Sequence, residues 1–72
     1  MKFEDFEKTI RERGYGIAAM NHYKLGGKNY TFCIVFGKDK EKAFKAEGEN
    51  SEEVFETIAN QIIKFESKAH SC

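Results

Sequence analysis

The sequence contains no proline and no tryptophan, and it has only two cysteines and two histidines among its 72 residues. Cys33 lies inside an apolar segment and Cys72 is the last residue, so the pair does not form the disulfide framework of a small secreted domain. The spacing of the cysteines from His22 and His70 matches no zinc motif. We therefore expect free thiols, no bound metal and no cofactor.

A membrane span and a net charge are also missing. No apolar run approaches the roughly 20 residues that a spanning helix needs, and the first ten residues are charged at nearly every second position, unlike a signal peptide. Twelve basic and twelve acidic residues give a formal net charge of zero, whereas domains that hold nucleic acid are usually clearly basic. These features favour a cytoplasmic protein and argue against nucleic-acid binding as its main task.

The most strongly β-forming segment is 29–37, Asn-Tyr-Thr-Phe-Cys-Ile-Val-Phe-Gly. Side chains of a strand alternate between its faces, which gives the sets Phe32, Ile34, Phe36 and Thr31, Cys33, Val35. Both sets are largely apolar, as expected for the central strand of a small sheet. The chain is short enough for one domain with one small core, and its seven phenylalanines should supply much of that core.

Two amphipathic segments lie at the ends of the chain. Phe3, Phe6 and Ile10 recur at helical spacing and predict a helix over about 2–13, followed by Gly14 in the position of a C-terminal glycine. Near the other end, the sequence predicts a helix over about 51–66, and 67–72 is expected to be a disordered tail. The predicted N-cap of this last helix is Asn50, with Glu53 completing a capping box, and Ser51 is the alternative N-cap.

Three strands are predicted between the helices, over 15–24, 29–37 and 41–47. Gly26 and Gly27 form a two-residue hairpin turn between the first two strands. This turn predicts pairs of Tyr23 with Tyr30, Asn21 with Phe32, Ala19 with Ile34 and Ile17 with Phe36 on one face, and of Met20 with Cys33 and Ala18 with Val35 on the other. A polar turn at 38–40 leads to an edge strand that places Phe44 beside Ile34.

The sequence therefore predicts an α+β domain of order α-β-β-β-α, a three-stranded antiparallel meander with both helices on one face. The predicted core face of the sheet consists of Ile17, Phe32, Ile34, Phe36 and Phe44.

This pattern resembles the double-stranded-RNA-binding domain, which has the same element order and nearly this length. The second strand of that family carries alternating large apolar residues, as Phe32, Ile34 and Phe36 do here. Ser51 and Ala59 fall where the family has a serine at the start of its last helix and an alanine within it. The resemblance implies the same arrangement of sheet and helices.

The same comparison argues against duplex RNA as the ligand. Glu52 and Glu53 stand where the family has two lysines that grip phosphates, and carboxylates there would repel a duplex. The loop at 25–28 also lacks the family's histidine. Small phage and plasmid proteins, including some inhibitors of CRISPR nucleases, share this architecture, but architecture alone does not specify a function.

The sheet face left open by the helices is the first candidate for a partner site. With the core face given above, the open face carries Ala18, Met20, His22, Thr31, Cys33 and Val35, and all of these except Ala18 are taken as partner-binding residues. A continuous apolar patch of this kind often marks a partner or dimer contact. The alternative is that the two faces are inverted and these residues belong to the core.

Two charged groups are further candidates. The lysines of the third strand and the turn before it could contact phosphates, although a solvated edge strand explains them as well; they are Lys38, Lys40, Lys42 and Lys45. The carboxylates at the start of the last helix could mimic phosphates toward a basic partner, although they also complement the helix dipole; they include Glu52, Glu53 and Glu56.

The residues carry little sign of catalysis. Cys33 and His22 could meet diagonally on one face, but no orienting group or oxyanion donor accompanies them. We expect a non-catalytic binding module that acts through protein–protein interaction, with self-association as a homodimer or an inhibitor or regulator from a phage or mobile element as versions of it. The alternative is a nucleic-acid-binding domain that uses the lysine-rich edge.

Overall fold

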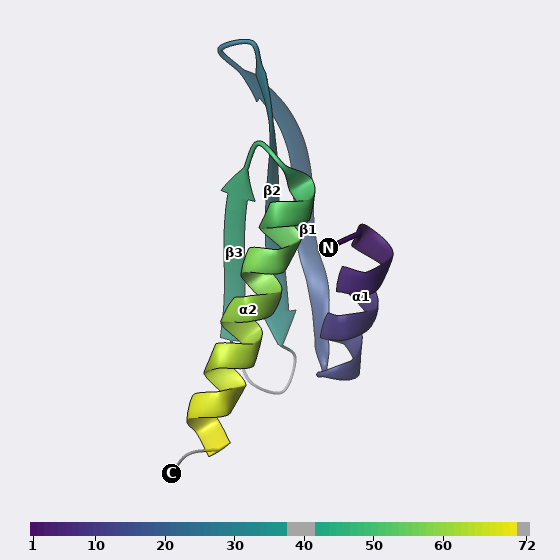
Figure 1. The fold of residues 1–72 in the computed structure, drawn as a ribbon, viewed down its shortest axis with the longest axis vertical. Helices are drawn as coiled ribbons and strands as arrows, with labels where there is room; N and C mark the ends of the chain where they lie inside the picture. Colours follow the sequence, from purple (N-terminus) through teal and green to yellow (C-terminus); the bar gives the residue numbers. More distant parts are fainter. Residues whose placement is uncertain (38–41, 71–72) are drawn as a thin grey trace.

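The structure, a computed structural model, describes residues 1–37 and 42–70, and side chains as far as Ser67. The predicted element order is confirmed as α1 (Phe3–Glu12), β1 (Tyr15–Leu25), β2 (Lys28–Gly37), β3 (Lys42–Gly48) and α2 (Ser51–His70). The strands form an antiparallel sheet of order β1-β2-β3, and both helices lie against it (Figure 1). Within the described ranges, no helix is both long and apolar enough to cross a membrane.

α1 forms where the sequence places apolar residues at helical spacing. Phe6 and Ile10 are fully buried beneath it. The helix ends because Gly14 adopts a positive φ of 86°, which glycine tolerates without a steric penalty. The amide of Gly14 donates to the carbonyl of Arg11 at 3.1 Å and so satisfies one of the terminal carbonyls.

α2 begins with the predicted asparagine cap. The Oδ1 atom of Asn50 accepts hydrogen bonds from the amides of Glu52 at 2.9 Å and Glu53 at 3.4 Å, as an N-cap does. The helix continues to His70, so the tail expected over 67–70 is helical instead, and 71–72 lie outside the described residues. The residues that follow Glu66 include no glycine or proline, so no helix-breaking residue ends α2 earlier.

The core joins the two ends of the chain. The ring of Phe6 stacks on that of Phe55 at 4.8 Å between centroids, and Phe3 meets Phe55 edge to face at 5.7 Å. The buried cluster adds residues from the sheet and α2: Ile10, Tyr15, Cys33, Val35, Phe44, Val54, Ile58, Ala59 and Ile62. Aromatic contacts across the helix layer therefore fix both helices over the same sheet face.

The predicted assignment of the two sheet faces is wrong. The helices cover Cys33 and Val35, which are 0% exposed, whereas Phe36 is 43% exposed. Phe32 and Ile34 are partly exposed. The cause is the pairing of β3, in which Phe44 stands opposite Val35 and Lys45 stands opposite Ile34, one residue away from the predicted pairing. A shift of one residue exchanges the faces of a strand.

A β-bulge explains how β1 supplies both Ile17 and Met20 to the covered face. The register shifts between Ile17 and Ala19, so Ala18 is an extra residue in β1. Ile17 pairs with Val35 instead of the predicted Phe36, and the pairs from Ala19 to Tyr23 are as predicted. A bulge inserts one residue without a partner and resets the alternation of side chains.

The β1–β2 hairpin projects beyond the helices as an arm, seen at the top of Figure 1. Every residue from 21 to 29 is exposed. Gly26 and Gly27 have φ values of 60° and 80°, which suit a two-residue hairpin turn. Leu25 at the tip is 66% exposed.

Candidate functional site

The open sheet face is the side of the sheet opposite the helices. Its central row comes from β2 and is aromatic or branched, because alternation places every second residue there. Smaller or polar residues of β1 and β3 flank this row. The face consists of Gly16, Ala19, Asn21 and Tyr23 from β1, Tyr30, Phe32, Ile34 and Phe36 from β2, and Ala43, Lys45 and Glu47 from β3.

The polar end of this face is held by a side chain that crosses the sheet. The hydroxyl of Tyr23 on β1 donates to Oε2 of Glu47 on β3 at 2.7 Å. The ring of Tyr23 also stacks on Tyr30, with 5.4 Å between centroids and 20° between planes. The hydrogen bond to Glu47 raises the pKa of Tyr23 above its usual 10.0, with burial and nearby charge adding to it, because the donor must stay protonated. Glu47 is thus fixed on the open sheet face.

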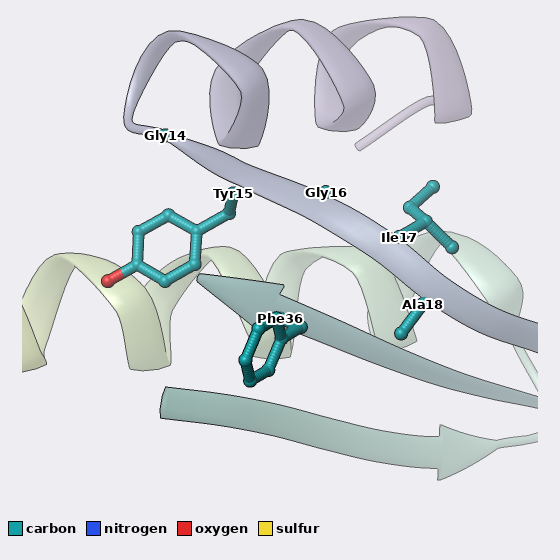
Figure 2. A pocket seen from close by; sticks show the side chains of 6 residues that line it. All are labelled: Gly14, Tyr15, Gly16, Ile17, Ala18 and Phe36. Atoms are coloured by element: carbon teal, nitrogen blue, oxygen red, sulfur yellow. The ribbon is translucent and has the colours of Figure 1, made fainter. Parts of the chain in front are cut away.

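A shallow hollow of about 350 Å³ lies at the other end, beside the bulge. Figure 2 shows its lining, with Phe36 on β2 and the start of β1 around it. The lining residues are Gly14, Tyr15, Gly16, Ile17, Ala18 and Phe36. None of them has a charged side chain at neutral pH, so the hollow suits an apolar or aromatic group.

A second hollow, the lysine groove, lies between the edge strand β3 and α2. It measures about 490 Å³ and is lined by Lys42, Ala43, Phe44, Lys45, Gln61, Lys64 and Phe65. Its lining includes no carboxylate. The Nζ atom of Lys42 lies 5.8 Å from the ring centroid of Phe44 and 5.6 Å from that of Phe65, within the range of a cation–π contact. The groove is therefore a cationic rim over an aromatic floor.

The residues predicted for a partner site are divided by the structure. Cys33, Val35 and Thr31 lie under the helices, which overturns their place on an open face. Met20 packs against the core. His22 is exposed at the start of the arm, and its Nδ1 lies 3.0 Å from Oγ1 of Thr31.

Cys33 is also not placed as a nucleophile. Its side chain is fully buried, and burial raises the pKa of the thiol above its ordinary value of 9.0. A reactive cysteine needs the opposite, a partly exposed site that favours the thiolate. His22 contacts Thr31, and the residue paired with Cys33 on β1 is Met20.

The two charged groups have different outcomes. Glu52, Glu53 and Glu56 are exposed on α2, in the helix layer and away from the open sheet face. Of the predicted lysines, Lys42 and Lys45 line the lysine groove, and Lys38 and Lys40 lie outside the described residues.

Lys64 was not predicted, because sequence spacing does not show which residue of a helix faces a strand edge. The open sheet face was missed for a different reason. Lys45 and Glu47 alternate with Phe44 and Ala46, which correctly marks the Phe44 side of β3 as covered. The predicted pairing, however, placed Phe44 beside Ile34 instead of Val35, and this assigned the wrong face of β2 to the core.

The part of the chain that the structure describes contains no group of three or more His, Cys, Asp or Glu side chains that could hold a metal ion. No family model matches the chain, and neither a search of curated proteins nor one of solved structures gives a match. The α-β-β-β-α topology agrees with that of the double-stranded-RNA-binding domain, and the likeness extends to topology alone.

Proposed function

We propose that this protein is a non-catalytic binding module and that the open sheet face binds another protein. One observation carries the proposal: a row of large apolar side chains, of which Phe36 is 43% exposed, runs along the central strand, and no described element covers it. Contiguous exposed apolar surface of this kind is typical of interaction sites.

The shape of the face favours a protein over a small molecule. Small-molecule sites are concave and enclose most of their ligand, whereas this face is a three-stranded sheet with shallow hollows near Phe36 and beside Phe32. Its charged residues on β3, Lys45 and Glu47, balance each other. An apolar centre with a few charges at its rim is the anatomy of a protein interface.

A photoreactive side chain placed on the face tests this function. A benzophenone amino acid at position 36 is expected to form protein adducts in cells, whereas the same group at Glu12, exposed on α1, is not. Excess unlabelled protein should compete for the adducts, and excess Phe36→Glu protein should not. Equal labelling from both positions, or competition by both proteins, would overturn the proposal.

The lysine groove supports a second function, binding of single-stranded nucleic acid. Three lysines converge there without a carboxylate in the lining, although the net charge of the chain is zero. Phosphates could lie on the ammonium groups and a base on the ring of Phe65.

Fluorescence anisotropy with labelled single strands tests this second function. Affinity should fall steeply with salt, and it should fall again when Lys42 and Lys64 are both replaced by glutamate. The same double charge change at Lys8 and Lys24, away from the groove, is the matched control. Binding that ignores salt, or that the two double variants weaken equally, would exclude the groove.

A further inference from the structure

We propose that the protein on the open sheet face is a second copy of this chain, packed face to face with its strands antiparallel to those of the first. This inference rests on the proposed function and names its partner. The open sheet face is self-complementary in apolar surface, in charge and in shape, and each of these properties comes from residues whose positions the register fixes.

The apolar surface sets where the symmetry axis falls. A two-fold axis between the sheets, perpendicular to the strands and midway between Phe32 and Ile34, places Phe32 of one copy on Ile34 of the other. The same axis places Phe36 on Tyr30. Every member of the central row then meets an apolar or aromatic group, and an isologous contact makes each pair twice.

Charge complementarity follows from the same axis. Lys45 and Glu47 are neighbours on the open side of β3, opposite Ile34 and Phe32 respectively. The axis therefore brings Lys45 of each copy to Glu47 of the other. Glu47 is already held on this face by the hydrogen bond from Tyr23. Two opposite-charge pairs at the rim fix the antiparallel register over a parallel one.

The shapes also match. The stacked pair of Tyr23 and Tyr30 is the bulkiest part of the face, and the axis places it over Phe36 and Gly16. Those two residues border the hollow of about 350 Å³ beside the bulge. Large side chains of one copy therefore meet the cavity of the other, as sheets that pack face to face require.

The area of the face predicts how tight the contact is. The seven residues of β2 from Tyr30 to Phe36, like the seven residues of β3, span about 24 Å, and three strands about 4.8 Å apart present a width of about 14 Å. The product is about 340 Å² for each copy, compared with about 800 Å² per partner in a standard interface. We therefore expect a reversible dimer with a dissociation constant in the micromolar range.

Sedimentation equilibrium of the purified chain measures this directly. The average mass should rise from one chain toward two as concentration increases from about 1 μM to about 500 μM. Phe36→Glu should weaken association at least tenfold, because it places a carboxylate from each copy against the partner's Tyr30 in the apolar row. Ile63→Glu is the matched control, since it makes a comparable change at a residue of α2 that is 44% exposed in the helix layer, away from the open sheet face, and it should dimerise like the wild type.

A charge exchange tests the register itself. Lys45→Glu and Glu47→Lys should each weaken self-association about tenfold, because each homodimer would contain two like-charge pairs. When the two variants are mixed, both pairs become opposite in charge again, so heterodimers should form with nearly wild-type affinity. This recovery cannot arise from a folding defect, since a misfolded variant would not regain binding on mixing.

Four outcomes would overturn the inference. These are a chain that stays monomeric at the highest concentration, a dimer that tolerates Phe36→Glu, a dimer that the Ile63→Glu control also loses, and charge variants that do not recover on mixing. The position-36 cross-link separates this failure from that of the proposed function. Adducts with the mass of an unrelated protein, together with a monomeric chain, would leave the binding face in place and exclude self-association. Absence of any adduct would remove both proposals.

Discussion

Replacing Gly37 with alanine should destabilise the protein, although the change adds only one methyl group. Gly37 ends β2 directly opposite Tyr15. A Cβ atom at this position would lie 2.6 Å from Cε2 and 2.9 Å from Cδ2 of the Tyr15 ring. Favourable contacts between carbon atoms begin near about 3.5 Å, so the ring must move by almost 1 Å.

The ring has little room to move, and this sets the magnitude. Tyr15 is 4% exposed and meets Phe44 edge to face at 5.9 Å. Overpacking a core in this way costs about 1–3 kcal/mol, and we expect about 2 kcal/mol for Gly37→Ala. For a domain of this size, this corresponds to a melting temperature lower by about 8–16 °C. It is also a substantial part of the roughly 4–11 kcal/mol that a chain of 72 residues usually has.

Gly16→Ala is the matched control on the neighbouring strand. A Cβ atom there would meet nothing within 4 Å, and Gly16 does not adopt a positive φ. This substitution should therefore be neutral or stabilise by up to about 1 kcal/mol, through the lower entropy of the unfolded chain. Urea denaturation of both variants measures the difference.

A double-mutant cycle assigns the cost to the ring. In the background Tyr15→Leu the ring is absent, and Gly37→Ala should then cost at least about 1 kcal/mol less. The reasoning would be refuted if the two glycine variants were equally stable, or if the cost of Gly37→Ala were the same with and without Tyr15.

Three further predictions concern titration and capping. Burial raises the pKa of the Cys33 thiol above 9.0, so the unfolded chain releases this proton at a lower pH than the folded chain does. The free energy of unfolding should therefore fall as the pH rises from about 9 through the folded pKa. In urea titrations at several pH values, Cys33→Ala should show a smaller loss above pH 9, and parallel curves for the two proteins would contradict this. Glu47→Gln should lower the pKa of Tyr23 toward 10.0, seen as earlier tyrosinate absorbance, whereas an unchanged curve would exclude the hydrogen bond as the cause. Asn50→Ala should lower the stability to thermal unfolding by about 1 kcal/mol, and Asn50→Ser should retain most of it, because serine also caps helices; equal losses would argue against capping.

Much of the fold could be predicted from the sequence, because local signals and tertiary packing agree there. The turn at Gly26 and Gly27 predicted the pairing of the hairpin strands. Every predicted pair between the Tyr23–Tyr30 pair and the Ala19–Ile34 pair is present. Apolar spacing likewise located both helices. These features depend on turn geometry and on helical periodicity, which a single segment carries by itself.

The candidate site could not be predicted, because β2 is apolar on both faces. The larger side chains, Phe32 and Phe36, favoured the wrong face, since volume suggested the core. Cys33 and Val35 instead pack beneath the helices, where smaller residues leave room for the aromatic rings of Phe6 and Phe55. Which face is covered depends on the pairing of β3, and a one-residue difference in that pairing decides it.

The bulge in β1 has a consequence for how this sequence can vary. Deleting one residue from a strand normally turns every later side chain to the opposite face and destroys the core. Ala18 is the exception, because it is the unpaired residue at which the alternation of β1 is reset. A chain without Ala18 would place Tyr15, Ile17, Met20 and His22 on one face in strict alternation. We therefore expect this single deletion to be tolerated in the middle of a strand, and gaps in alignments of this domain to fall there.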